Sequence, residues 1–425
     1  MRAAELFVES LEASGVEYIF GVPGEENLAF LEAIRGSTIE LVTTRDEQAA
    51  VFMAATVGRL TGRVGVALST LGPGATNLVT GVAYAQLGGM PLLVITGQKP
   101  IKKSKQGKFQ IIDVVGMMKP ITKMSETIVS GDRVAATVYQ AVRTAVDERP
   151  GAVHLELPED IAEEETDDLP IPWHEVRRPD ADQSTIDSAA LAIKNAKMPI
   201  VIIAAGANRK SVRGQLHNFL EHTNIPFITS QMGKGVEDES SRLYLGTTAL
   251  TSHDFMHHSI LSADLIIMIG HDIVEKPPVL AKSTQKIIHI NFYPADMDEV
   301  YRPDIEVIGD ISQALVAIQE QLPVVPKWDF REYFKIKKHM IEDINSGVDD
   351  SRFPIHPKRF VYELLEVMPR DGFLSLDNGM YKIWVARNYP AFEQNSVLLD
   401  NALATMGAGL PVGIATKLIN PHNKV

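Results

Sequence analysis

The acid Glu47 is placed where a helix is predicted to begin, and it is followed by small and apolar residues. The run at 49–55 contains no charged residue. A carboxylate is favourable near a helix N-terminus, so Glu47 could be a simple helix-capping acid. In an apolar pocket the same carboxyl group would favour its protonated form and could exchange a proton with a ligand. From these residues alone, both interpretations stay open.

A glycine-rich stretch, LGPGATN at 71–77, is the second feature that could do chemistry. Apolar runs at 64–69 and 91–96 predict buried parallel strands around it, and ligands of such sheets lie beyond the carboxyl ends of the strands. The stretch could also be a tight turn. A dinucleotide fingerprint fits poorly, because Asn77 takes the third glycine place and no acid follows about 20 residues later. Together with 21–27 and Gly97, this stretch is expected to form one of three glycine loops at one sheet edge.

The composition excludes several classes of protein. The chain has 425 residues, enough for two or three domains, and its formal net charge of −13 argues against a nucleic-acid partner. Without cysteine it has no disulfide, no thiolate metal site and no cysteine nucleophile. Neither a signal peptide nor an apolar run of about 18 residues is evident. We therefore expect a cytoplasmic protein with no membrane partner.

Three polar stretches are given ordinary interpretations. The basic residues at 99–108 are predicted to form a solvated loop, and the acids at 159–168 a solvated linker face. His253 and His257, with His258 beside them, have the i,i+4 spacing of helical metal ligands, but no third ligand follows a recognisable pattern. No metal site is predicted there.

Apolar runs predict three α/β domains, at 1–162, 183–322 and 356–425. Besides the two strands above, strands are predicted at 18–20, 153–157, 200–204, 226–229, 265–269, 287–290, 372–375 and 397–399, with a last one beginning at Val425. Two βα units in about 70 residues cannot close an α/β core. The third domain is therefore expected to be incomplete.

Six motifs occur in an order that resembles the thiamine-diphosphate-dependent acetolactate synthase family. They are FGVPG at 20–24, the Glu47 helix, GPGATN at 72–77, FQ at 109–110, RPGAVH at 149–154 and TMG at 405–407. The resemblance covers essentially the whole chain. It implies a pyrimidine-binding, a central and a diphosphate-binding α/β domain with parallel sheets. It also implies a homodimer or homotetramer whose active sites lie between chains.

The resemblance assigns roles to individual residues. Glu47 matches the acid that hydrogen-bonds a ring nitrogen of the cofactor's aminopyrimidine, so that the neighbouring amine can take the C2 proton; Gln110 matches a second catalytic residue. Phe109 and Gln110 match residues beside the reacting carbon of the substrate. The remaining matches are expected to bind the cofactor: Val22, Pro23, Gly24, Pro73, Asn77, Gly379, Met380, Tyr381, Ala404 and Met406. The family has glycine where Ala404 stands, a change that is harmless if φ is negative.

Departures from the family pattern refine the expected function. The magnesium and diphosphate motif is expected beyond Val425, so no metal ligand is named and the chain as given is expected to be inactive alone and to bind the cofactor weakly. Glu159 and the HDIVE segment at 271–275 replace residues of flavin-binding relatives, which implies no FAD and a likeness to the catabolic synthases that condense two pyruvates into 2-acetolactate and CO2. The alternatives are another thiamine-diphosphate-dependent 2-oxo-acid decarboxylase or aldehyde lyase, or a truncated, non-catalytic chain.

Overall fold

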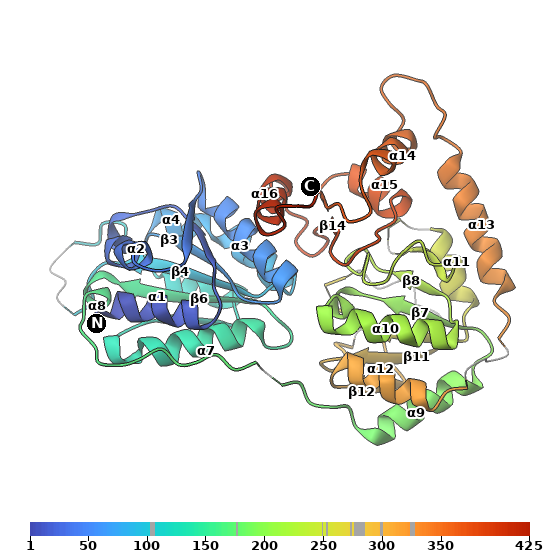
Figure 1. Ribbon diagram of the computed structural model, residues 1–425, viewed down its shortest axis with the longest axis horizontal. Coiled ribbons are helices and arrows are strands. Elements are labelled where there is room, and N and C mark those ends of the chain that lie inside the picture. Colours follow the sequence, from blue (N-terminus) through green and yellow to red (C-terminus); the bar gives the residue numbers. More distant parts are fainter. Residues whose placement is uncertain are drawn as a thin grey trace. The chain divides into compact units, whose positions relative to one another are not determined.

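The computed structural model describes residues 1–102, 107–175, 177–248, 250–251, 254–272, 274–275, 285–297, 301–323 and 328–425. Its contacts divide the chain into two compact units. The first comprises Met1–Val176 and Ala402–Pro421, and the second Arg177–Asn401 and His422–Val425 (Figure 1). The three domain boundaries expected from the sequence stay predictions.

The first unit is built on a six-stranded sheet in the order β2-β1-β3-β4-β6-β5, with every neighbouring pair parallel. The predicted α/β class with parallel sheets is therefore confirmed. The central strands are short and buried on both faces, as the near-continuous apolar runs indicated. The strands are β1 (Tyr18–Gly21), β2 (Glu40–Thr43), β3 (Gly65–Ser69), β4 (Leu92–Gln98), β5 (Met124–Thr127) and β6 (Ala152–Pro158).

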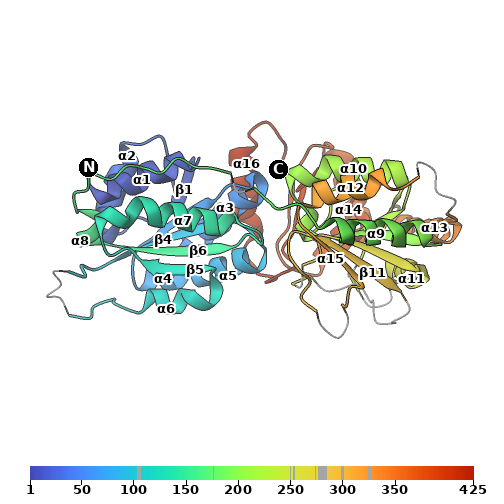
Figure 2. The ribbon, with the colours of Figure 1, turned by 90° about the horizontal axis from the view of Figure 1, so that it is seen from below.

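Helices cover both faces of this sheet (Figure 2). On one face α1 contacts α2 and α7, and their apolar stripes join a single core; on the other face α3 packs against α5. The helices of this unit are α1 (Ala3–Ala13), α2 (Leu28–Arg35), α3 (Glu47–Thr61), α4 (Pro73–Asn77), α5 (Val79–Leu87), α6 (Val114–Met118), α7 (Val134–Val146), α8 (Glu159–Ala162) and α16 (Gly409–Ile419), with 3₁₀ turns η1 (Glu25–Asn27), η2 (Lys119–Ile121) and η3 (Gly131–Arg133).

Helix α3 lies directly on the sheet and on α5 because glycines leave no side chain at these two contacts. A Cβ on Gly65 of β3 would lie 1.8 Å from the Ala54 carbonyl oxygen, and one on Gly81 of α5 would lie 2.5 Å from Val51 Cβ. Asp46 caps α3 by accepting from Gln48 N–H at 2.8 Å, and Gly62 ends it at φ 75°. These contacts fix the N-terminus of α3, and Glu47 with it, relative to the strand ends.

The second unit contains another parallel sheet of six strands, in the order β12-β11-β10-β7-β8-β9. Helices α9, α10 and α12 share one apolar core with it, and α11 and α13 another. The strands are β7 (Pro199–Ile203), β8 (Phe227–Thr229), β9 (Tyr244–Thr247), β10 (Leu265–Ile269), β11 (Lys286–Asn291) and β12 (Ile305–Ile308). The helices are α9 (Gln183–Asn195), α10 (Lys210–Thr223), α11 (Phe255–Ser262), α12 (Ile311–Glu320) and α13 (Arg331–Asn345), with the 3₁₀ turn η4 (Ala205–Ala207).

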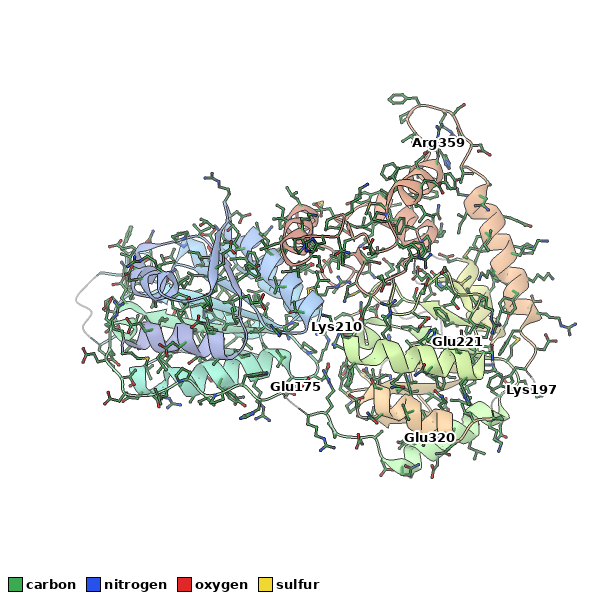
Figure 3. The ribbon with its side chains drawn as sticks, in the orientation of Figure 1. Glu175, Lys197, Lys210, Glu221, Glu320 and Arg359 are labelled. Carbon is green, nitrogen blue, oxygen red and sulfur yellow. The ribbon has the colours of Figure 1, made fainter. Side chains whose placement is uncertain are left out.

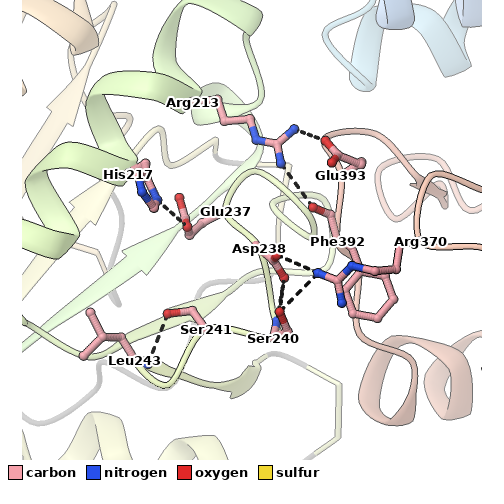
Figure 4. Close-up of polar contacts among 10 residues, drawn as sticks. All are labelled: Arg213, His217, Glu237, Asp238, Ser240, Ser241, Leu243, Arg370, Phe392 and Glu393. Atoms are coloured by element: carbon pink, nitrogen blue, oxygen red, sulfur yellow. Dashed lines mark hydrogen bonds and ion pairs between the residues drawn. The ribbon is translucent and has the colours of Figure 1, made fainter.

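A smaller subset of this unit consists of α14 (Pro357–Val367), β13 (Leu374–Ser375), α15 (Tyr381–Asn388) and β14 (Val397–Leu398), with β13 and β14 parallel. Figure 4 shows how its loops are tied to the rest of the unit. Arg213 of α10 pairs with Glu393, and Arg370 pairs with Asp238 at 2.8 Å while stacking on Phe392. These polar contacts hold together segments of the second unit that are far apart in the sequence.

Several sequence expectations need correction. Strands β2, β5, β9 and β12 and helix α13 were not predicted. All four strands lie at sheet edges, and the incomplete burial of β2, β5 and β12 weakens their apolar pattern. Gly97 is not in a loop but lies inside β4, and Val425 starts no strand, although the Lys424 carbonyl accepts from Phe373 N–H at 2.8 Å. No helix in the described part of the chain is long and apolar enough to cross a bilayer.

Candidate active site

The strand order of the first unit creates a switch point between β1 and β3. The chain passes from β1 to β2 on one side, and then crosses through α3 to β3 on the other side of β1. In open parallel sheets, the loops that follow two such strands diverge and leave a crevice at their carboxyl ends. The loop 22–27 follows β1 and the loop 70–77 follows β3, so both predicted glycine loops flank this point.

Glu47 lies at this edge of the sheet, and its partner there is an amide. Asn77 Nδ2 donates to Glu47 Oε2 at 3.0 Å. The carboxylate of Asp46, not that of Glu47, accepts from the backbone at the start of α3, so Asp46 is the N-cap. Glu47 is therefore not the N-cap itself, although it remains an acid in the first turn of α3, where a carboxylate is favourable. Glu47 is half-buried rather than enclosed by apolar residues; the buried residues of α3 begin at Ala50.

The glycines of the Gly72–Asn77 loop keep other groups close to this pair. A Cβ on Gly74 would lie 3.2 Å from Glu47 Oε1 and 2.5 Å from Ser69 Oγ. Gly72 has φ 54° and ψ −117°, a conformation that only glycine adopts without strain. A Cβ there would lie 2.8 Å from the Gln110 carbonyl oxygen. The loop thus needs glycine both for its path and for the approach of Gln110.

The other residues expected in the first unit lie around the same edge. Val22, Pro23 and Gly24 follow β1, and a Cβ on Gly24 would lie 2.5 Å from Thr70 Cβ, so the two glycine loops touch. Pro73 opens the short helix α4 that ends at Asn77. Gln110 is exposed with φ 58°, and Phe109 is 75% exposed.

The residues expected from the last part of the chain fall into both units. Ala404 and Met406 precede α16, which packs on α3 within the first unit (Figure 1), and Met406 is 76% exposed. Ala404 has φ 57°, so replacing the family's glycine is not harmless as expected: the alanine Cβ is strained in the left-handed region. Gly379, Met380 and Tyr381 belong to the second unit, where Met380 is 75% exposed.

Two stretches that were expected to be solvated instead make specific contacts. Lys99 Nζ lies 2.8 Å from Glu26 Oε1 and 3.5 Å from Glu159 Oε1, and the lysine side chain is only 12% exposed. Asp160 accepts from the backbone N–H groups of Ile101 and Lys102. The sequence analysis missed Glu26 and Lys99 as residues of the site. Their positions after β1 and β4 were the available signal, because both strands end at the same edge.

The described residues provide no metal centre. No group of three or more His, Asp or Glu among them could hold a metal ion. His253 lies outside the described residues, while His257 and His258 lie on α11. His154, in the RPGAVH motif, is buried between Thr96 Oγ1 and Ser125 Oγ, both at 2.8 Å, and burial lowers its pKa to about 3. It is therefore a neutral core residue.

The comparisons with known proteins agree with this arrangement. Three thiamine pyrophosphate enzyme families match the chain: the N-terminal TPP binding domain at residues 1–117, the central domain at 186–318 and the C-terminal TPP binding domain at 377–425. Thiamine pyrophosphate is another name for thiamine diphosphate.

Whole-chain similarity extends to curated acetolactate synthases. The catabolic acetolactate synthase of Raoultella terrigena is 33% identical over 100% of this chain and 77% of its own length. A probable acetolactate synthase large subunit of Methanocaldococcus jannaschii is 33% identical over 100% of this chain and 75% of its own. The acetolactate synthase of Bacillus subtilis is 30% identical with the same coverage. The chain therefore belongs to the thiamine-diphosphate-dependent acetolactate synthase family.

Proposed function

We propose that this protein is an acetolactate synthase, which joins two pyruvate molecules into 2-acetolactate with loss of CO2. The observation that carries the proposal is the Glu47–Asn77 pair at the switch point of the first unit, in a chain of this family. A relative described as catabolic and one described as a large subunit are equally similar to this chain. The catabolic role is therefore a separate, more specific proposal. It rests on Glu159 and the segment 271–275.

The residues at the switch point fit the aminopyrimidine of thiamine diphosphate. That ring presents acceptor nitrogens and an amine, which suit a carboxyl group beside a carboxamide. The missing side chain of Gly74 leaves space next to Glu47 Oε1, where a Cβ would lie at 3.2 Å. Thiamine diphosphate supplies, when bound, the nucleophilic carbon that decarboxylation of a 2-oxo acid requires.

Glu47 is the proposed proton-exchanging group. Its Oε2 is engaged by Asn77, and the structure gives Oε1 no hydrogen-bond partner among the residues it describes. Oε1 is therefore the oxygen proposed to share a proton with the pyrimidine ring. Asn77 orients the carboxyl group, while Val22, Pro23, Gly24 and Pro73 are proposed to line the pyrimidine. Gln110, with Phe109, is proposed to contact the 2-oxo acid, because its backbone approaches Gly72.

The rest of the proposed cofactor site uses residues from the end of the chain. Ala404 is proposed to accept from the pyrimidine amine through its carbonyl, and Met406 to support the cofactor as an apolar wedge. Gly379, Met380 and Tyr381 are proposed to lie near the diphosphate. The exposure of Met380 and Met406 supports this proposal, since large apolar side chains in open positions commonly meet a ligand or another chain. We propose a homodimer or homotetramer with active sites between chains.

Magnesium and flavin belong to the proposal as well. We propose that Mg²⁺ holds the diphosphate, as oxygen ligands and phosphates suit this ion; no ligand is assigned. We propose that no FAD is bound, since Glu159 lies against Lys99 and Glu275 accepts from Ala205 N–H at a strand end of the second unit. Purified protein should show no flavin absorbance, which for oxidised flavins lies at about 450 nm.

The proposal is tested by Glu47→Gln in the full-length protein, assayed for acetolactate and CO2 with saturating thiamine diphosphate and magnesium. Glutamine keeps the shape and the contact with Asn77 but cannot exchange a proton in the same way. Acetolactate formation should fall at least about a hundredfold. Asp46→Asn is the matched control: it changes the neighbouring acid at the same helix start, and asparagine caps helices as well as aspartate.

The outcomes separate the candidate functions. Wild-type activity in Asp46→Asn together with a loss in Glu47→Gln supports the proposal. Activity of Glu47→Gln within about threefold of wild type would refute the role of this residue. Release of CO2 by the wild type without acetolactate would favour a decarboxylase or lyase, and no thiamine diphosphate binding by calorimetry would favour a non-catalytic chain.

A further inference from the structure

Glu26 is a buried acid in a loop where an exposed residue would be ordinary. It lies in the turn η1 after β1, and its side chain is only 6% exposed, whereas the preceding Glu25 is exposed. An acid is rarely buried without partners, because desolvation penalises its charged form. The partners of Glu26 therefore indicate why the fold retains it.

The two oxygens of Glu26 bind two different loops. Oε1 lies 2.8 Å from Lys99 Nζ, directly after β4, and Oε2 accepts a hydrogen bond from Thr70 Oγ1, directly after β3. Glu26 itself follows β1. One carboxylate thus joins the carboxyl ends of three neighbouring strands, and two of them, β1 and β3, flank the switch point.

Thr70 connects Glu26 with the backbone that lies next to the proposed catalytic acid, Glu47. Thr70 lies two residues before Gly72, and a Cβ on Gly24 would lie 2.5 Å from the Thr70 Cβ. Its Cγ2 would lie 2.9 Å from a Cβ on Gly74, which in turn would lie 3.2 Å from Glu47 Oε1. Rotation of Thr70 would therefore move the backbone that lies against Glu47.

The charges of the pair are maintained by their mutual contact. The hydrogen bond that Lys99 donates to Glu26 raises the pKa of Lys99. Burial by itself would raise the pKa of Glu26, but the hydrogen bonds from Lys99 and Thr70 outweigh burial and lower this pKa. Both groups are therefore ionised at neutral pH, and Lys99 orients Glu26 toward Thr70.

We propose that Glu26 is a positioning residue of the active site: its carboxylate, oriented by Lys99, holds Thr70 and thereby sets the Gly72–Asn77 loop against Glu47. Glu26 contacts neither substrate nor cofactor in this role. The inference rests on the proposed function, because the loop matters only if Glu47 and Asn77 do chemistry.

The experiment compares Glu26→Gln and Thr70→Val with Thr70→Ser and Glu25→Gln. Thr70→Val removes the hydroxyl while leaving the ion pair of Glu26 and Lys99 intact, so it separates positioning from charge balance. Thr70→Ser restores the hydroxyl, and Glu25→Gln makes the same change as Glu26→Gln on the neighbouring exposed acid. Hydrogen exchange of peptides covering 70–78 is measured without cofactor, followed by kcat and KM for pyruvate in the full-length protein.

We expect loop exchange to rise about tenfold in Glu26→Gln and in Thr70→Val, with the sheet peptides of the first unit unchanged. In the same two variants kcat should fall about tenfold to a hundredfold, with KM for pyruvate within about twofold, because small misplacements of reacting groups cost rate. Glu25→Gln should match wild type in both measurements, and Thr70→Ser should lie closer to wild type than Thr70→Val in both, because it keeps the hydroxyl group while losing the methyl group next to Gly74.

Unchanged loop exchange in Glu26→Gln or Thr70→Val would overturn the inference. A uniform rise of exchange across the whole first unit would also overturn it, because that pattern indicates a purely structural ion pair. If the wild type forms no acetolactate while loop exchange responds as expected, the proposed function fails and the positioning of the loop by Glu26 stands.

Discussion

Glu275, in the second unit, should make the stability of this protein depend on pH in an unusual direction. Its carboxylate is buried, accepts from Ala205 N–H at 2.9 Å and from Ser230 Oγ, and lies near Asp272. Burial, which the hydrogen bonds from Ala205, Ser230 and Met232 only partly offset, raises its pKa from 4.5 to about 7, and the charge of Asp272 adds to this rise. The folded protein thus keeps a proton that the unfolded chain releases.

The sign of the effect follows from proton binding. Between pH 4.5 and 7 the folded state binds more protons at this site than the unfolded state, so the free energy of unfolding falls as the pH rises. The pKa of Glu275 differs between about 7 in the folded state and 4.5 in the unfolded state, and each pKa unit corresponds to about 1.36 kcal/mol. The protonated Glu275 therefore contributes about 3 kcal/mol to the free energy of unfolding below pH 4.5, and this contribution is absent above pH 7. About 2–3 kcal/mol of it is lost between pH 5 and pH 8.

Glu275→Gln should remove this dependence. The glutamine oxygen can accept from Ala205 N–H and its amide can donate to Ser230 Oγ, so the variant resembles the protonated acid. Urea unfolding is measured for both proteins from pH 5 to pH 8 at fixed ionic strength, and the difference between them at each pH cancels the titration of the other groups. We expect the variant to gain about 2–3 kcal/mol relative to wild type across this range.

Glu320→Gln is the matched control for this measurement. Glu320 is exposed at the end of α12 in the same unit (Figure 3), so the same substitution there leaves the surroundings of Glu275 unchanged and should show no such gain. If the difference between Glu275→Gln and wild type changed by less than about 0.5 kcal/mol, Glu275 would not carry a raised pKa and the reasoning from its burial would be refuted.

Two further substitutions test local energetics by urea unfolding. Ala404→Gly should raise the free energy of unfolding by up to about 1 kcal/mol, because it relieves the strain of an alanine at φ 57°. Ala408→Gly, at φ −75°, should instead lower it by about the same amount. Equal effects of the two substitutions would contradict the strain argument. Lys234→Met should lower the free energy of unfolding by about 3–5 kcal/mol, because it leaves the fully buried Glu239, 2.6 Å away, without its ion-pair partner. The double variant Lys234→Met/Glu239→Gln should recover much of this free energy. If the effects of the two single substitutions simply added, the pair would not act as a unit.

The sequence alone determined the features that depend on neighbouring residues. Apolar runs predicted the central parallel strands β3, β4, β7 and β10, because strands buried on both faces are apolar throughout. The start of α3 at Glu47 followed from its helix-start signals and the apolar run behind it. The order of the motifs was enough to indicate the family, which the whole-chain similarity then showed.

Only the tertiary structure decided which of these residues meet. Edge strands such as β5 and β12 are only partly buried, so no clear apolar pattern marks them. The pairing of Glu47 with Asn77, and that of Glu26 with Lys99, joins residues 30 and 73 positions apart, and no local pattern specifies such contacts. Because no local pattern marks the contact with Glu26, Lys99 was expected to be solvated. The left-handed backbone of Ala404 is likewise set by packing around it, since alanine by itself prefers negative φ.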